Sequence, residues 1–173
     1  MEEPDRVAHR AARVITVDFL HSRLPGSLYD VIVEKGKLAS TAPSVTIARV
    51  APRSFVLTIG ADIAPGVPPE RLLAAISDYV DTLSAAGIPA ETVERLKKRF
   101  LDARANADRH PQQVYNRLVT WLANHNRYED LAAWPQRVAA VSPDEVAGIV
   151  RGLSGSGRVV TGMLVPAGLE AAQ

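Results

Sequence analysis

The histidines are the first candidates for chemistry, because imidazole is both a common zinc ligand and a general base. The sequence has four of them: His9, His21, His110 and His125. A catalytic zinc site takes about three protein ligands, often two of them one turn apart on a helix. Neither His-x-x-Glu-His nor His-Glu-x-x-His occurs in the sequence. His125 and Glu129 have the right spacing for a pair, but no third ligand accompanies them. We interpret them as a solvated helix end and expect no metal site in this chain.

Residue patterns for nucleophilic catalysis and phosphate binding are also missing. The sequence has no Gly-x-Ser-x-Gly motif and no cysteine, so a serine elbow and thiol chemistry are both excluded. The glycine-rich stretch GLSGSGR, residues 152–158, follows a predicted helix and precedes a predicted strand. In phosphate-binding loops the glycines open a helix, which is the reverse order. We therefore do not expect this loop to bind phosphate.

Other charged and aromatic residues have plain structural interpretations. Asp78 and Asp81 could form an acid–base pair, but their spacing near the exposed side of a helix is typical of solvated carboxylates. The basic run Arg95–Arg99 is interpreted as a solvated helix face. Trp121 and Trp134 are expected to anchor a core or an interface rather than to form a ligand cage. None of these groups predicts a site.

The overall charge and hydropathy exclude further classes of function. The 173 residues include 20 Lys and Arg against 19 Asp and Glu, which gives a net charge of +1. A nucleic-acid-binding domain would need a basic excess on one face, so we expect no nucleic-acid partner. No apolar run approaches the roughly 20 residues of a membrane span. The hydrophobic content of 47% is that of an ordinary globular domain.

The hydrophobic periodicity predicts an α+β fold with one small antiparallel sheet and helices packed on one face of it. Helices are predicted over 6–21, 27–36, 69–86, from 90 onward, over 111–124 and 129–138, and from Ser142, which begins a capping box. Strands are predicted over 38–50, 55–63 and 158–166, the first two as a hairpin. We expect the helices that start near Pro69 and Ala90 to cover the sheet. The residues expected to build the sheet are Val45, Ile47, Phe55, Leu57, Ile59, Val159 and Val160.

The segment PGSLYDVIVEKGKLASTAPSV, residues 25–45, resembles a stretch of the pitrilysin/insulinase family of zinc peptidases, which includes the mitochondrial processing peptidase subunits. The residues that match as they stand are Leu28, Tyr29, Glu34, Leu38 and Ala39. Further along, RVAAVSPDEVAGIVRGL resembles a later helix of the family. The order of elements is similar from about Asp5 to Pro166, nearly the whole chain, and this order carries the resemblance more than any single motif.

The resemblance implies a half-domain of a clam-like peptidase in which a different half holds the zinc on His-x-x-Glu-His. In the family the segment quoted above often supplies an Arg and a Tyr that help to stabilise the substrate carbonyl. In this sequence those two positions are Val33 and Ser40. Neither can stabilise charge in that way, and the zinc motif is absent. The resemblance therefore implies a non-catalytic half without a cofactor of its own, with zinc expected in the partner half.

We accordingly expect a single inactive peptidase-like domain over residues 1–166, lacking the leading strands of a full half, and a flexible tail over 167–173. Its expected partners are a zinc-bearing half, in the same polypeptide or as a separate subunit, and a peptide substrate. The alternative is a scaffold or interaction module on the same fold, without a role in proteolysis. For both the peptidase half and the scaffold module, we expect a soluble protein of the bacterial periplasm or cytoplasm. Peptide specificity and oligomeric state do not follow from the sequence.

Overall fold

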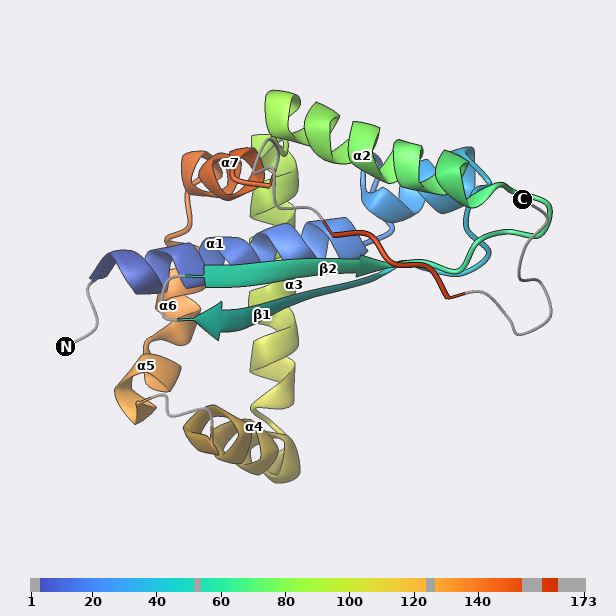
Figure 1. Cartoon of the computed structure of the whole chain (residues 1–173). Coiled ribbons are helices and arrows are strands. Elements are labelled where there is room, and N and C mark those ends of the chain that lie inside the picture. The colour runs from blue at the N-terminus through green and yellow to red at the C-terminus, as the bar shows by residue number, and fades with distance from the viewer. Residues whose placement is uncertain (1–3, 52–53, 124–126, 154–159, 165–173) are drawn as a thin grey trace.

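The computed structural model describes residues 4–51, 54–123, 127–153 and 160–164. Side chains 4–9, 49–51 and 54–55 also lie outside the description. The elements in chain order are α1 (Pro4–His21), the π-helix η1 (Asp30–Lys35), β1 (Ser44–Ala51), β2 (Ser54–Gly60), α2 (Pro69–Ala86), α3 (Ala90–Ala107), α4 (Pro111–Ala123), α5 (Tyr128–Ala132), α6 (Trp134–Ala139) and α7 (Pro143–Arg151) (Figure 1). The α+β prediction is confirmed.

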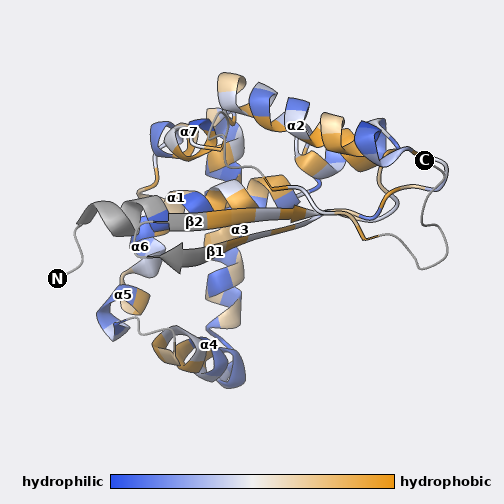
Figure 2. Ribbon diagram, viewed as in Figure 1, coloured by the Kyte–Doolittle hydropathy of each residue, from blue (hydrophilic) through white to orange (hydrophobic). Residues whose placement is uncertain are grey.

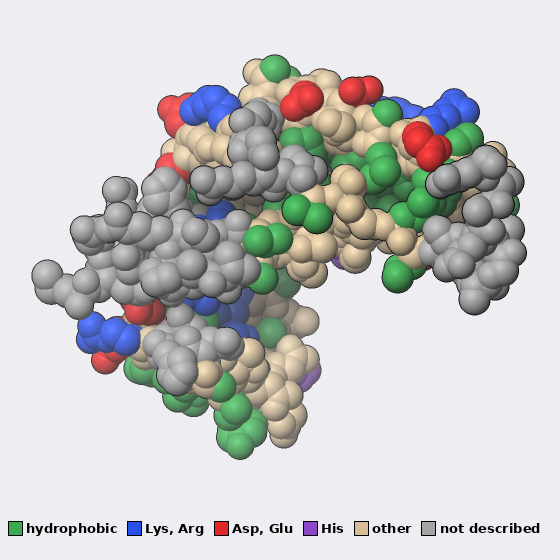
Figure 3. Space-filling view, viewed as in Figure 1, with side chains coloured by type: hydrophobic (Ala, Val, Ile, Leu, Met, Phe, Trp, Pro, Cys, Tyr) green, Lys and Arg blue, Asp and Glu red, His purple; other side chains and the backbone are tan. Residues whose placement is uncertain are grey.

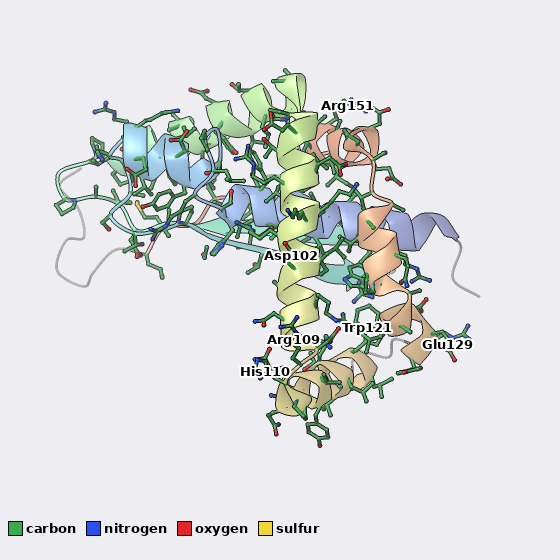
Figure 4. The ribbon with its side chains drawn as sticks, turned by 180° about the vertical axis from the view of Figure 1, so that it is seen from behind. Asp102, Arg109, His110, Trp121, Glu129 and Arg151 are labelled. Carbon is green, nitrogen blue, oxygen red and sulfur yellow. The ribbon has the colours of Figure 1, made fainter. Side chains whose placement is uncertain are left out.

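Helix α1 lies at the centre of the molecule and carries much of the core. Ala11, Ala12, Ile15, Phe19 and Leu20 are all buried. The sheet lies on one side of α1 and α3 lies on the other, while α6 and α7 also contact it (Figures 1 and 4). The two alanines let neighbouring elements approach closely, because a methyl group takes little room. Figure 2 shows apolar residues along the strands and the C-terminal half of α1.

The prediction that α2 and α3 cover the sheet is wrong. The helix that packs on β1 is α1, whereas α2 packs on α7 and η1, and α3 packs on α6, α1 and α7. Hydrophobic periodicity shows which face of a helix is apolar, but it does not show which element that face meets. The burial of α1 on several sides makes it the layer between the sheet and the other helices.

The two strands form the predicted antiparallel hairpin. Val45 pairs with Ile59 and Ile47 pairs with Leu57, so these side chains share the face that meets the core. A bulge lies between Arg49 and Ala51. Phe55 pairs with Arg49 in the backbone ladder, but its side chain lies outside the described residues.

The predicted last strand, 158–166, is wrong over the part that the structure describes. Residues 160–164 form no ladder, and Val160 and Leu164 are almost completely exposed. Alternating β-branched residues favour a strand, but a strand also needs an edge with which to pair. Val159 and the tail expected over 167–173 lie outside the described residues.

Two helix ends, at Ser142 and Gly87, follow local sequence signals. At the start of α7, Glu145 N donates to Ser142 Oγ at 3.2 Å and Ser142 N donates to Glu145 Oε2 at 2.7 Å, which confirms the capping box. Gly87 ends α2 with φ of 73°. The helix predicted over 129–138 is two helices, α5 and α6, which join at Ala133. Within the described ranges, none of the helices has the length and apolar character required to cross a membrane.

The basic run in α3 is solvated except at one residue. Arg95, Lys98 and Arg99 are exposed as predicted, but Lys97 is only 8% exposed. Its Nζ donates to Val141 O and to Glu94 Oε1, both at 2.8 Å. A buried ammonium needs such partners, because desolvation without them is costly. The expectation of a wholly solvated face is therefore corrected at Lys97.

Candidate functional site

The candidate site is built on the segment 27–40, and Asp30 organises its first turn. Asp30 Oδ2 accepts from Gly26 N at 2.8 Å and from Lys35 Nζ at 2.7 Å. The hydrogen bond from Lys35, followed by that from Gly26, lowers the pKa of Asp30 below its usual range. On the other side, Tyr79 Oη of α2 donates to Gly26 O at 3.0 Å. Burial is the main cause that raises the pKa of the Tyr79 phenol. These hydrogen bonds fix the backbone at Gly26, just before the start of η1.

The helix predicted over 27–36 is largely a π-helix, and Gly36 at its end does not take the left-handed conformation in which a glycine commonly ends a helix. Gly36 has φ of −75°, whereas Lys37 takes the left-handed conformation with φ of 50°. Gly36 N donates to Val31 O at 2.9 Å, and a Cβ at Gly36 would lie 2.6 Å from that oxygen. Gly36 is therefore required for close approach of the backbone rather than for a positive φ.

After η1 the chain runs beside the segment that follows β2. Ala39 forms a bridge with Ile63, Ser40 N donates to Asp62 O at 2.9 Å, and Ala64 N donates to Leu38 O at 2.9 Å. Leu38 and Ala39 are buried, so this segment contributes apolar side chains to the core. This short pairing of residues 38–40 with 62–64 continues the antiparallel arrangement of the hairpin beyond its open end. It also holds Ser40 at the surface.

The two positions at which family members often carry Arg and Tyr are uncharged here, and they serve packing and a turn. Val33 is half-buried and packs against the core. Ser40 is exposed, and its Oγ donates to Asp62 O at 3.3 Å. Beside it, Thr41 Oγ1 donates to Asp62 Oδ2 at 2.7 Å. A hydroxyl that is bonded to the backbone and an isopropyl group supply no positive charge for a developing oxyanion.

A small polar cluster near the start of the segment was missed by the sequence analysis. The guanidinium carbon of Arg23 lies 5.0 Å from the centre of the Tyr29 ring. A hydrogen bond with Glu34 is the main cause that raises the pKa of Tyr29. The five-residue spacing of Tyr29 and Glu34 matches the wider turn of a π-helix, a signal visible only once η1 is known. The cluster holds Tyr29 in place and contains no nucleophile with a base.

The outward face of the hairpin carries small, uncharged residues. The residues on this face are Ser44, Thr46, Ala48, Val56, Thr58 and Gly60. Ser44, Thr46, Ala48, Val56 and Thr58 are exposed, and the helix that packs on the hairpin lies against its other face. In Figure 3 the described charged side chains on this side gather over the surrounding helices. The face is open and has unbonded strand edges among the described residues, which are the features that an extended peptide can use.

Among the residues that the structure describes, the histidines and acidic residues do not converge. His21 and His110 are exposed, the side chain of His9 is not described, and His125 lies outside the described residues. His110 lies at the turn between α3 and α4, far along the chain from Glu129 on α5, and Figure 4 shows the two side chains on separate elements. Among the described residues no group of three or more His, Cys, Asp or Glu could hold a metal ion. The described part of the chain thus does not fit zinc.

The remaining candidates have structural roles. Asp78 and Asp81 are exposed on α2. Trp134 is buried, and its ring centre lies 5.7 Å from that of Trp121. The guanidinium of Arg10 lies 4.3 Å from the Trp121 ring and 5.4 Å from the Trp134 ring. This group joins α1, α4 and α6, which is the anchoring role predicted for the tryptophans.

Comparisons with known proteins agree with the fold. No protein-family model matches the sequence, and no curated protein sequence matches it significantly. Among solved structures, the putative zinc protease from Bordetella pertussis Tohama I superimposes with a TM-score of 0.71 at 21% identity, over 86% of this chain and 81% of that one. The inactive peptidase domain of a putative zinc protease from Bordetella parapertussis gives a TM-score of 0.72, also at 21% identity, over 86% and 80%.

A longer protein also contains this fold. A protease from Helicobacter pylori superimposes with a TM-score of 0.70 at 17% identity over 87% of this chain, which spans only 35% of that protein. The putative M16-like peptidase from Alicyclobacillus acidocaldarius shows the same relation, with 33% of its length covered. The chain therefore has the fold of M16, or pitrilysin-like, peptidase domains, as the resemblance in the sequence predicts. At these identities the likeness establishes the fold.

Proposed function

We propose that this chain is a non-catalytic half of a zinc metallopeptidase and forms one wall of the peptide chamber opposite a zinc-bearing half. The fold supports this proposal, since a structural neighbour with the same fold is an inactive peptidase domain. The neutral side chains of Val33 and Ser40 agree with a half that contributes no charge to the reaction.

The observation that carries the proposal is the open, uncharged outward face of the hairpin. Ser44, Thr46 and Thr58 offer hydroxyls that can donate to or accept from a peptide, and the described residues of this face carry no charge that would select a particular side chain. Such a wall serves catalysis in another half by orienting the peptide and by excluding water. It takes no part in bond cleavage.

The proposal is tested with the His-x-x-Glu-His-bearing unit encoded in the same polypeptide or beside it. Cleavage of a fluorogenic peptide is measured for that unit alone, for this chain alone, and for the two mixed. We expect turnover only where the zinc-bearing unit is present, and a rise in kcat/KM on mixing. If the two units associate but cleavage does not rise on mixing, this chain does not act as a chamber wall.

A variant of the outward face makes the test specific. Thr58→Arg places a long cation on this face, and we expect it to reduce kcat/KM of the mixture by about tenfold, equal to about 1.4 kcal/mol. Ser77→Arg adds the same group on the exposed side of α2 and is expected to leave kcat/KM unchanged. An equal loss of kcat/KM in both variants would show that the added charge or reduced stability causes the effect, and not the blocking of the outward face of the hairpin.

The alternative function is an interaction module without a role in proteolysis. Exposed apolar side chains on α4 favour it, because they offer a protein-binding surface away from the sheet. The mixing experiment separates the two functions: association without any change in cleavage supports the interaction module.

A further inference from the structure

Helix α4 lies at one end of the molecule and has no buried side chain in any of its 13 residues (Figure 1). It contacts α5, and Arg117 and Trp121 are two of the side chains that hold it to the rest of the chain. Arg117 forms an ion pair with Asp108 at the end of α3. The Trp121 ring lies under the Arg10 guanidinium, and its Nε1 donates to Arg127 O at 2.8 Å. Both tethers lie on one side of α4.

A stripe of large apolar residues follows the free side of α4. Tyr115, Val119 and Leu122 recur at i, i+4 and i+7, so they lie on one helix face, and they are 61%, 46% and 46% exposed. We call these three residues the α4 stripe. Figure 3 shows hydrophobic side chains gathered at this end of the molecule. Single apolar residues on a surface are ordinary, but a contiguous stripe marks a contact with another molecule.

The charge pattern of α4 suits a second copy of the same helix. Arg117 is the only charged residue in α4, and it is paired with Asp108 on the tethered side. The polar residues beside the stripe include Gln112 and Asn116, whose amides hydrogen-bond to each other at 2.9 Å. An amide carries donors and acceptors, so two identical edges can bond to one another, whereas two like-charged edges repel.

We propose that the α4 stripe is the contact surface for a second copy of this chain, with the two α4 helices packed antiparallel about a two-fold axis. Such an axis places the same patch on both subunits. Val119 lies near the middle of the stripe, so it meets Val119 of the second copy. The tethers through Arg117 and Trp121 remain intact in the dimer, because they face away from the axis.

The size of the surface predicts a reversible dimer. A helix of 13 residues is about 20 Å long. Two such helices bury less than the roughly 800 Å² per partner of a standard stable interface. We therefore expect the chain to dimerise with rising concentration and to dissociate on dilution.

Sedimentation equilibrium on the 173-residue chain, over a series of concentrations, tests the proposal through Val119→Glu and Val119→Lys. Each variant brings like charges together at the axis, so each is expected to weaken dimerisation at least tenfold. An equimolar mixture of the two variants pairs opposite charges, and we expect it to regain the dimer. This recovery occurs only if residue 119 of one copy lies against residue 119 of the other.

Gln113→Glu is the matched control, since it adds the same charge to α4 on the side away from the stripe. We expect it to dimerise as the native chain does, and circular dichroism checks that all variants are folded. A native chain that stays monomeric at every concentration overturns the proposal and assigns the stripe to a different partner. Dimerisation of Val119→Glu at native strength, or failure of the mixture to recover, overturns it as well.

Discussion

At the residue scale, the turn after η1 contains Gly36 and Lys37, and each occupies a position that suits a different kind of residue. Position 36 has no room for a Cβ, whereas position 37 has the positive φ that favours glycine. Lys37 has φ of 50°, and the left-handed conformation costs an ordinary residue roughly 1–2 kcal/mol. Lys37→Gly removes this strain but makes the unfolded chain more flexible, at a cost of about 0.5–1 kcal/mol. We expect a net stabilisation of up to about 1.5 kcal/mol in urea unfolding.

Gly36→Ala is the counterpart and is expected to have the opposite sign. Its Cβ would lie 2.6 Å from Val31 O, so the backbone has to move. Overpacking of this kind costs about 1–3 kcal/mol. Stabilisation by Gly36→Ala together with destabilisation by Lys37→Gly would contradict the described turn.

The lowered pKa of Asp30 predicts a pH dependence of stability. An aspartate whose pKa is lower in the folded state stabilises that state above the unfolded pKa of about 4, and this contribution disappears as pH falls through the folded pKa. Asp30→Asn keeps the shape but removes the charge. We expect it to be less stable than the native chain near neutral pH, and this difference to be smaller when unfolding is measured at about pH 3. A difference that is the same at both pH values would show that Asp30 is not held by Lys35 and Gly26.

At the scale of elements, Lys97 joins α3 to the junction between α6 and α7. Its removal in Lys97→Met leaves Val141 O buried without this donor, and we expect a loss of about 1–3 kcal/mol in unfolding free energy. Lys98→Met changes an exposed neighbour and is expected to stay within about 0.5 kcal/mol of the native chain. Similar unfolding free energies for the two variants would mean that Lys97 is solvated, as the sequence alone indicated.

The existence of most elements could be predicted from the sequence, but their partners could not. Capping at Ser142, the glycine at 87 and the hairpin pattern at Val45 and Ile59 are local signals, and each is confirmed. The segment around Val160 has strand propensity without a partner, so it forms no strand over the described residues. Burial of Lys97 depends on a carbonyl 44 residues away, which no local pattern reveals.

At the scale of the whole molecule, the order of elements predicted the fold. Val33 and Ser40, at the positions where family members often carry Arg and Tyr, led to the hypothesis of a non-catalytic half. The Arg23, Tyr29 and Glu34 cluster was not predictable, because it depends on the wider turn of η1. The exposed stripe on α4 was likewise hidden, since its pattern in the sequence is that of an ordinary amphipathic helix.

Restoration of the two family residues should not create an enzyme. Val33→Arg with Ser40→Tyr supplies groups that stabilise charge in a transition state, but such groups act only on a reaction that has an activated nucleophile. The sequence has no His-x-x-Glu-His to hold a metal that would activate water. We expect the double variant to cleave no peptide, and thermal unfolding checks that it is folded. Cleavage by the double variant but not by the native chain would show that a nucleophile is already present.

We propose that this chain, which has the fold of a peptidase domain, does not cut peptides by itself. The most direct measurement is cleavage of a mixed peptide library by the purified native chain, with and without a chelator, together with zinc analysis after dialysis. We expect no cleavage and no stoichiometric zinc. Cleavage that the chelator abolishes, with about one zinc bound per chain, would contradict it.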